Sequence, residues 1–492
     1  MTKPKSCELY TPQSARTLER RQRWNTCSFR TMARVMLVFC VATIAGSAQT
    51  LNTLVNFDGN NGETPFYMSL IQGFDGNYYG TTSWGGLEGW GTVFRMTPTA
   101  RLTTLYSFCG QCASNRPYAG LVQATNGRFY GTTVSSAPPD YAGSVFEITA
   151  AGKLTTLHDF DSQDGTSPLS ALVQATNGRL YGTTQGCCSY SAGTVFEITT
   201  AGTLTTLYNF GSGASGAYPY AGLIQASDGS FYGTTSQGGA NGYGTVFKIT
   251  AAGKLTTLYS FCSRANCADG SYPYGGLVQA TDGSFYGMTN EGGSRNNGTV
   301  FKMTTAGELT TLHSFRGPDG ANPVSGLVQG TDGQLYGMAP GLGAHGYGTV
   351  FRVSTKGVLT TLHSFDGNDG SYPLGGLIQG TDGSFYGATT YGGNSNHCYG
   401  GGCGTIFRLS MGLRPFVETL PKSGEVGATV FIVGSNLTGA TSVTFNGIPT
   451  KFTVISKSEI KTTVPSGAGT GKVKVTTSGS TLISNAAFRV GR

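Results

Sequence analysis

The chain has 492 residues, of which 77 are glycine and only 12% are charged, about half of the fraction usual in soluble domains. Its formal charge of +7 is uneven, because residues 1–49 and 414–492 each carry +6 and the region between them carries −5. An acidic central region offers no footprint for a phosphate backbone, so we expect no nucleic-acid partner.

The first 48 residues have the organisation of a secretory signal peptide with a long basic n-region. An apolar run at 35–45 follows the basic segment, and small residues at 46–48 end it. Because eleven apolar residues are too few to span a bilayer comfortably, we predict cleavage after residue 48 and a mature chain without a transmembrane anchor. An uncleaved signal anchor is the alternative, and Met32 competes with Met1 as the start.

Removal of this leader leaves eight cysteines, which occur as four local pairs. Three of these pairs are predicted to form disulfides that close short loops in an oxidising compartment: Cys109 with Cys112, Cys262 with Cys267, and Cys398 with Cys403. The spacing of the first pair also suits half of a zinc site, but no second half accompanies it. The state of the adjacent Cys187 and Cys188 stays open. We therefore expect a secreted or cell-surface protein.

From Leu51 to Ser410 a phrase of about fifty residues recurs. Its marker is a Tyr-Gly pair, found in seven copies at Tyr79, Tyr130, Tyr181, Tyr232, Tyr286, Tyr336 and Tyr386. The second copy shows four strand-like segments, at 121–124, 129–133, 144–149 and 154–160. Its Asn126-Gly127 pair predicts a two-residue hairpin between the first two strands. Four antiparallel strands in seven copies predict an all-β chain with a seven-bladed β-propeller over residues 49–412.

The two ends of the array predict a closed ring. The last copy stops after its third strand near Leu409, whereas the first copy has a spare leading strand at 51–57. Pairing these two strands would complete the last blade and remove two exposed sheet edges. An open solenoid is the alternative.

Residues 415–492 follow a different pattern of short alternating strands separated by glycine and proline. This pattern favours a small immunoglobulin-like sandwich. In this segment Val473 is expected to point inward between the exposed Lys472 and Lys474.

Two resemblances accompany these patterns. The phrases at 276–287 (GLVQATDGSFYG) and 298–303 (GTVFKM) resemble the GloVer-type tandem repeat, which is named in choice-of-anchor proteins exported by some bacteria. The C-terminal segment is similar to an IPT/TIG domain, chiefly through 445–447 (FNG) and 464–465 (VP). The resemblances imply an exported protein and supply no catalytic residue.

Strand order places the candidate site. In an antiparallel blade the second turn and the link to the next blade lie on one face, and these are the segments in which the copies differ. Binding residues concentrate on loops that a rigid frame carries, and aromatic rings can stack on sugars or peptide groups. The candidate binding residues are therefore the aromatic side chains of this face, although packing between blades is the alternative: Trp84, Trp90, Tyr118, Tyr220, Tyr274, Tyr347 and Tyr391.

Other polar groups are interpreted as structural. A glutamine recurs in every copy, as expected of a residue that satisfies backbone groups between blades. The links at 161–165 and 366–370 resemble loose calcium loops but lack the oxygen spacing of an EF-hand, so we expect turns and no cofactor, with calcium as the weaker alternative. No metal site is predicted.

The function predicted from the sequence is carbohydrate or protein binding by a monomer. The first alternative is a polysaccharide-processing hydrolase or lyase, for which Glu88 and Glu291 are the only glutamates in second turns. A glycosidase needs two carboxylates close together, and these belong to different copies, so we predict no catalytic residue. The second alternative is a structural component of the cell envelope.

Overall fold

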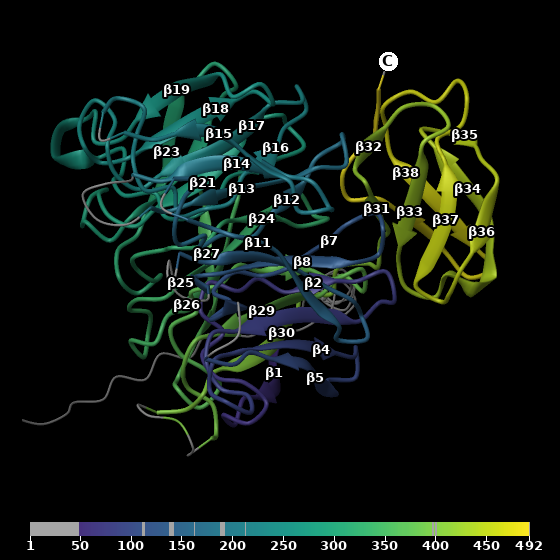
Figure 1. Ribbon diagram of the computed structural model, residues 1–492, viewed down its shortest axis with the longest axis horizontal. Helices are drawn as coiled ribbons and strands as arrows, with labels where there is room; N and C mark the ends of the chain where they lie inside the picture. The colour runs from purple at the N-terminus through teal and green to yellow at the C-terminus, as the bar shows by residue number, and fades with distance from the viewer. Residues whose placement is uncertain are drawn as a thin grey trace, which may run out of the picture. The chain divides into compact units, whose positions relative to one another are not determined.

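The computed structural model describes residues 49–110, 114–136, 142–161, 163–186, 192–211, 213–395, 398 and 401–491. The predicted signal peptide and Cys187 and Cys188 lie outside them. Within the described residues each repeat forms one four-stranded antiparallel sheet, which confirms the predicted all-β fold (Figure 1). No helix in this part of the chain has the length and apolar character that crossing a membrane requires.

The blades are numbered in chain order, and their strands have the following bounds. Blade one contains β2 (Ile71–Gln72), β3 (Tyr78–Thr82), β4 (Thr92–Met96) and β5 (Leu102–Ser107). Blade two contains β7 (Val122–Gln123), β8 (Phe129–Thr133), β10 (Ser144–Ile148) and β11 (Leu154–Asp159). Blade three contains β12 (Val173–Gln174), β13 (Leu180–Thr184), β14 (Thr194–Ile198) and β15 (Leu204–Asn209). Blade four contains β16 (Ile224–Gln225), β17 (Phe231–Thr235), β18 (Thr245–Ile249) and β19 (Leu255–Ser260).

Blade five contains β20 (Val278–Gln279), β21 (Phe285–Thr289), β22 (Thr299–Met303) and β23 (Leu309–Ser314). Blade six contains β24 (Val328–Gln329), β25 (Leu335–Ala339), β26 (Thr349–Val353) and β27 (Leu359–Ser364). Blade seven contains β28 (Ile378–Gln379), β29 (Phe385–Thr389), β30 (Thr405–Ser410) and β1 (Thr50–Asn56). The short strands β6 (Ser114–Asn115) and β9 (Ser135–Ser136) pair with each other, and η2 (Ala265–Cys267) is a single 3₁₀ turn.

The predicted mixed blade is confirmed. Strand β1 pairs antiparallel with β30 in the register Thr50↔Ser410 to Asn56↔Thr405, so the first strand of the chain completes the last blade. Directly after β1, Phe57 is fully buried and packs edge-on against Phe94 of blade one, with ring centroids 5.6 Å apart. The N-terminal strand thereby joins the last and first blades.

The predicted two-residue hairpin between the first and second strands is wrong. In blade two the N–H of Ala124 donates to Arg128 O, and the N–H of Gly127 donates to Ala124 O. Only Gly127 has a positive φ, 80°, whereas a type I′ hairpin would need one at Asn126 as well. The glycine therefore ends a three-residue loop, and the first strand is two residues long instead of four.

The recurring glutamines form the predicted belt between blades. Each Oε1 accepts the backbone N–H of a residue in the preceding blade, as Gln379 does from Thr331 at 3.0 Å. The belt also crosses the closure, because Gln72 of blade one accepts from Thr381 of blade seven at 2.9 Å. Each Nε2 donates within its own hairpin, as Gln379 does to Gly383 O at 3.2 Å.

We predict that Gln379→Leu lowers the free energy of unfolding by about 1–3 kcal/mol, because it leaves the half-buried N–H of Thr331 and the buried carbonyl of Gly383 without this partner. Thermal unfolding followed by circular dichroism would measure this loss. Gln334→Leu, in the hairpin of blade six, is the matched control. Gln334 donates its backbone N–H to Asp332 Oδ1, and this hydrogen bond does not involve the side chain that the substitution changes. Equal stability of the two variants would contradict the proposed role of the belt.

The marker tyrosines anchor the same turns. In five blades the Tyr hydroxyl donates to the Asp of its own Asp-Gly turn, as Tyr232 does to Asp228 at 2.8 Å, and in blade four Lys248 of the third strand pairs with that carboxylate at 2.7 Å. In blades two and three an Asn replaces the Asp, and the third strand carries a Glu that pairs with an Arg next to the turn, as Glu147 does with Arg128. In blades two and three the acidic residue is therefore on the third strand and the basic residue is next to the turn, the reverse of blade four. The marker tyrosine is buried in both arrangements.

The C-terminal part folds as two four-stranded sheets of a sandwich, with strand orders β31-β33-β37-β36 and β35-β34-β38-β39 (Figure 1). The strands are β31 (Glu418–Leu420), β32 (Ser423–Gly424), β33 (Thr429–Val433), β34 (Ala440–Phe445), β35 (Ile448–Pro449), β36 (Phe452–Val454), β37 (Glu459–Thr463), β38 (Val473–Thr477), β39 (Thr481–Ile483) and β40 (Arg489–Val490), with the 3₁₀ turn η3 at Leu437–Gly439. Val473 is fully buried, and the flanking Lys472 and Lys474 are exposed, as predicted.

Candidate functional site

The links and second turns of the blades form one continuous surface, which we call the loop face. A link is assigned here to the blade that it enters. Isolated bridges join the two segments within a blade, as between Ser371 of the link and Tyr391 of the second turn in blade seven. The link also contacts the second turn of the preceding blade, since the N–H of Tyr372 donates to Tyr347 O at 3.0 Å. The prediction that the variable segments share a face is confirmed by these contacts.

One position of each link has the same unusual backbone. The residue before the link proline has a φ between 52° and 57° in all seven copies. Residues other than glycine rarely adopt this left-handed backbone conformation. These residues are Thr64, Arg116, Ser167, Tyr218, Tyr272, Asn322 and Tyr372. In each copy the N–H donates to the second turn of the neighbouring blade. The fixed backbone therefore places seven different side chains at equivalent points of the loop face.

The second turn of blade seven is the longest. In blade four the hydroxyls of Thr235 and Thr245 lie 2.8 Å apart across a separation of ten residues. The equivalent Thr389 and Thr405 lie 2.8 Å apart across sixteen residues, so the blade is unchanged and six residues are added to its loop. A Cys398–Cys403 disulfide closes the added segment.

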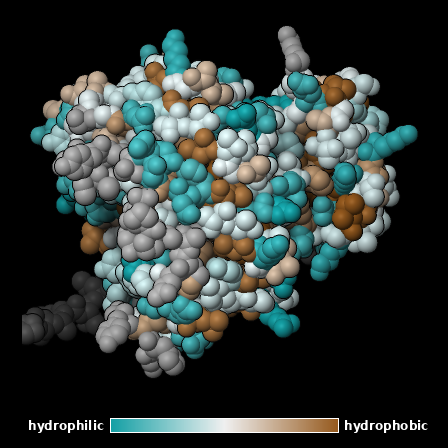
Figure 2. Space-filling view, viewed as in Figure 1, coloured by the Kyte–Doolittle hydropathy of each residue, from teal (hydrophilic) through white to brown (hydrophobic). Residues whose placement is uncertain are grey.

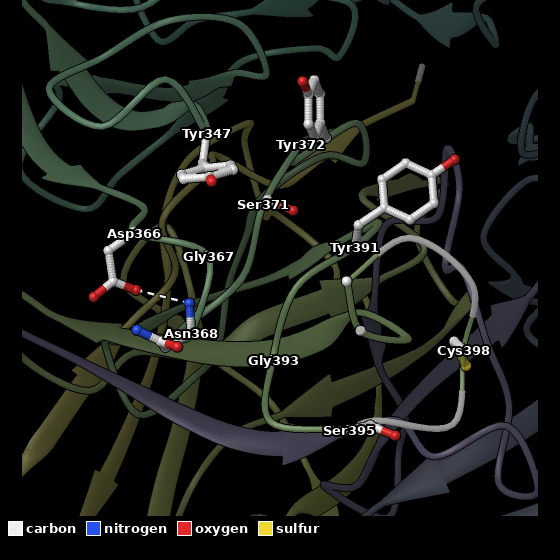
Figure 3. Close-up of a pocket in the computed structure, with 12 residues that line it drawn as sticks. Tyr347, Asp366, Gly367, Asn368, Ser371, Tyr372, Tyr391, Gly393, Ser395 and Cys398 are labelled. Carbon is white, nitrogen blue, oxygen red and sulfur yellow. Dashed lines mark hydrogen bonds between the residues drawn. The ribbon is translucent and has the colours of Figure 1, made fainter.

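This longer turn forms one wall of a pocket of about 550 Å³ on the loop face (Figure 3). The pocket is lined by Tyr347 of blade six and by the link and second turn of blade seven: Asp366, Gly367, Asn368, Ser371, Tyr372, Tyr391, Gly393, Ser395, Cys398, Gly401 and Gly402. Its volume lies in the range of natural ligand sites. It occurs beside the second turn that is six residues longer than its equivalent in blade four.

Three tyrosine rings stand around the pocket and are partly exposed. Tyr347, Tyr372 and Tyr391 are 42%, 45% and 37% exposed. The rings of Tyr372 and Tyr391 are 6.1 Å apart at 80°, and in the close-up Tyr372 stands between Tyr347 on one side and Tyr391 on the other (Figure 3). A Cβ at Gly367 would lie 3.6 Å from the ring of Tyr347, so glycine brings the backbone close to that ring. The sequence identified Tyr347 and Tyr391 but missed Tyr372, although its position before a recurring proline was visible.

Asp366 is the only formally charged side chain among the described residues that line the pocket. Its Oδ1 accepts the backbone N–H of Asn368 at 2.9 Å (Figure 3) and that of Asp369 at 3.2 Å. The N–H groups of Asp369 and Asn368 lower the pKa of Asp366 below its ordinary value, so the carboxylate is ionised at neutral pH. The turn holds the charge at the pocket without a cationic partner among the described residues.

The loop face as a whole is acidic. Its described links and second turns contain ten acidic and four basic residues: Asp58, Glu63, Glu88, Asp161, Asp164, Asp269, Glu291, Asp319, Asp366 and Asp369, against Arg116, Arg264, Arg295 and Arg316. The other Lys and Arg side chains of the propeller lie on strands or on the first and third turns. A ligand that approaches the loop face therefore meets a formal charge of −6 on these segments.

The two tryptophans have an internal partner. The guanidinium carbon of Arg116 lies 4.1 Å from the ring centroid of Trp84 and 4.6 Å from that of Trp90, in cation–π contact with both. Trp90 also packs against the core cluster between blades one and two, whereas Trp84 is 38% exposed. The sequence did not reveal this contact, because Arg116 belongs to the link of the next blade. A binding role for the tryptophans stays a prediction. The guanidinium group of Arg116 already covers part of both ring surfaces.

The remaining aromatic candidates form a separate cluster where the links enter the first strands. Tyr220 and Tyr274 are 4.8 Å apart, and Tyr118 lies 5.2 Å from Phe66. Burial raises the pKa of Tyr67 to about 12, with smaller contributions from Tyr220, Tyr274 and Tyr118, so this phenol lies near all three. Copy one has one residue more between its link proline and its buried leucine, Pro65 to Leu70, than the other six copies have, as in Pro117 to Leu121. Packing accounts for this cluster, and a binding role for it stays a prediction.

Two predicted disulfides are present, Cys262–Cys267 and Cys398–Cys403. Cys109 is also disulfide-bonded, but its predicted partner Cys112 lies outside the described residues.

The link at 161–165 is a turn of the kind seen at Asp366, since Asp161 Oδ1 accepts the N–H groups of Gln163 and Asp164. Asp164 in turn pairs with His158 at 2.6 Å. Among the described residues no group of three or more potential metal ligands occurs. Glu88 and Glu291 lie in blades one and five, and Glu291 is bridged through its backbone to Ser271.

Comparison with protein-family models matches the Gloeobacter/Verrucomicrobia repeat to residues 38–177, 67–268 and 221–450, and the IPT/TIG domain to residues 416–490. A search of curated protein sequences finds no match.

Similar solved structures include a fungal alcohol oxidase of the AA5 family in complex with copper, with 12% identity, a TM-score of 0.49, and coverage of 90% of this chain and 99% of that one. Another is a putative 6-phosphogluconolactonase from Bacteroides fragilis, with 19% identity, a TM-score of 0.41, and coverage of 65% and 93%. An auxiliary nutrient binding protein from Bacteroides ovatus has 15% identity, a TM-score of 0.39, and coverage of 74% and 76%.

The repeat matches together span residues 38–450, most of the chain, and include all seven blades. The chain belongs to the Gloeobacter/Verrucomicrobia repeat family and carries a C-terminal IPT/TIG domain.

Proposed function

We propose that this is an exported carbohydrate-binding protein whose binding site is the pocket beside the second turn of blade seven. The observation that carries the proposal is the group of three partly exposed tyrosine rings around that pocket. A tyrosine ring covers the apolar face of a pyranose while its hydroxyl stays hydrated. Asp366, Asn368 and Ser371 add polar groups that can bind sugar hydroxyls.

The form of the surface supports a pocket in preference to a broad protein interface. In the space-filling view, hydrophobic residues occur in small groups among polar ones over the face shown (Figure 2). The exposed large hydrophobic residues come from many segments of the chain. A large contiguous apolar patch would have favoured a protein partner. Export is supported by the two disulfides described above and by the leader that the sequence predicts.

We predict that Tyr391→Ala and Tyr347→Ala each weaken glycan binding about tenfold, because each removes one stacking ring from the pocket. A glycan array probed with the chain from residue 49 onward would identify a ligand, and isothermal titration of the variants would measure the loss.

The matched control is Tyr243→Ala. Tyr243 occupies the place of Tyr347 in blade four, is 37% exposed and contacts Tyr272 at 5.4 Å. It does not line the pocket, so its loss should leave binding unchanged. The proposal is wrong if no glycan binds, or if Tyr391→Ala binds as tightly as the unaltered protein.

A further inference from the structure

The electrostatics of the pocket restrict which sugars it can accept. Its described lining contains the carboxylate of Asp366 and no cationic side chain. Asp369, the other acidic residue of this link, is already paired with His363 at 2.5 Å. A charged ligand would therefore meet a single negative group that has no internal partner among the described residues.

The tyrosine rings act in the same direction. The face of an aromatic ring carries negative electrostatic potential and attracts cations within about 6 Å of its centroid. Tyr372 and Tyr391 lie edge to face, with ring centroids 6.1 Å apart at 80°, and both rings are partly exposed, so a cation in the pocket could approach an exposed ring face. Rings and carboxylate together favour a positive charge on the ligand.

The surrounding surface adds a contribution of longer range. The described segments of the loop face carry a formal charge of −6, and the propeller region as a whole carries −5. Within a Debye length of about 8 Å at physiological salt, such a surface repels a polyanion and attracts a polycation. A uronic-acid or sulfated polymer is therefore disfavoured on approach as well as in the pocket.

We propose that the pocket selects glycans built from amine-bearing sugars, with the ammonium group against Asp366 and the pyranose rings on Tyr347, Tyr372 and Tyr391. This inference rests on the proposed carbohydrate-binding function and specifies its ligand class. An amino sugar is the class that presents a stackable ring face and a positive charge in one unit. A neutral sugar would use only the rings, and an acidic sugar would be repelled by the carboxylate.

Titration with three oligosaccharides of equal length would test the selectivity: a glucosamine oligomer, its fully N-acetylated counterpart and an oligouronate. The acetylated oligomer keeps the ring and removes the charge. At low salt and pH below the amine pKa, we expect the glucosamine oligomer to bind about fivefold more tightly than the acetylated one. The oligouronate should bind most weakly. Raising the salt to about 0.5 M should reduce the preference, because the carboxylate is exposed to solvent.

Asp366→Asn removes the charge and retains an Oδ1 acceptor for the turn. It should reduce the preference for the glucosamine oligomer to the part that the rings and the acidic surface supply, while leaving the affinity for the acetylated oligomer unchanged. Asp161→Asn is the matched control, because Asp161 makes the same turn in the link of blade three and does not line the pocket. This control should keep the fivefold preference.

The outcomes separate this inference from the proposed function. Equal binding of the glucosamine and acetylated oligomers, or an unchanged preference in Asp366→Asn, overturns the amine selectivity. If Tyr391→Ala still weakens binding about tenfold in that case, carbohydrate binding stands. If no oligosaccharide or array glycan binds, both are wrong. If binding of the glucosamine oligomer is insensitive to Tyr391→Ala, the attraction is a general effect of the acidic surface and the pocket assignment is wrong.

Discussion

Removing residues 50–57 is expected to destabilise the propeller by at least about 5 kcal/mol and to make the chain self-associate. The deletion removes the fourth strand of blade seven, exposes the edge of β30, and takes away the buried Phe57. Burial of Phe57 alone contributes about 3–5 kcal/mol, which Phe57→Ala would measure separately. Chemical denaturation and size-exclusion chromatography would record the two effects.

Two controls make this expectation specific to closure. Leu87→Ala, at a side chain that is 91% exposed, should leave stability unchanged. A synthetic peptide of residues 49–57 added to the shortened chain should restore a monomer of near-normal stability, because it can refill the edge of β30. A shortened chain that unfolds at the same denaturant concentration as the full one would show that β1 is dispensable.

Gly375→Ala should cost about 3 kcal/mol, at the upper end of the range for overpacking. Gly375 is buried in the link of blade seven, and a Cβ there would overlap the carbonyl oxygen of Met68 in the link of blade one. The obstacle is backbone, so it cannot rotate away, and relief requires the last and first blades to separate.

Denaturant unfolding of Gly375→Ala would measure the loss, and Gly211→Ala is the matched control. Gly211 lies in the link of blade four, where a Cβ would meet no atom within 4 Å. It has no positive φ, so alanine is tolerated there. If both variants unfold at the same midpoint, the close approach between the last and first blades does not limit stability.

The scaffold could be predicted because its constraints repeat. The seven marker tyrosines, the glutamine belt and the spare leading strand each follow from packing rules that act identically in every blade. The prediction of the first hairpin was wrong because it used only the two residues of the turn. Asn126-Gly127 suggested a two-residue hairpin, but the tyrosine hydroxyl and the neighbouring Glu147 hold a longer turn around that asparagine.

The candidate site could be predicted only in part, since it depends on neighbours from different blades. Tyr347 and Tyr391 were identified as aromatic residues of variable loops, but their meeting with Tyr372 and Asp366 requires the packing of blade six on blade seven. The same limit explains the tryptophans. Nothing near Trp84 in the sequence indicates that Arg116 covers its ring. Local patterns predict which residues are available, and three-dimensional adjacency decides which act together.

The mixed blade also sets an order of events during synthesis. Strand β1 emerges from the ribosome first, yet its partner β30 is the last strand of the propeller to be made. More than three hundred residues separate the paired positions, so this contact has the largest loop-closure entropy in the ring. Blades one to six can form as their residues appear, while β1, which contains both polar and apolar residues, stays unpaired. Until the seventh repeat arrives, the nascent protein is an open arc with both edges available to the wrong partner.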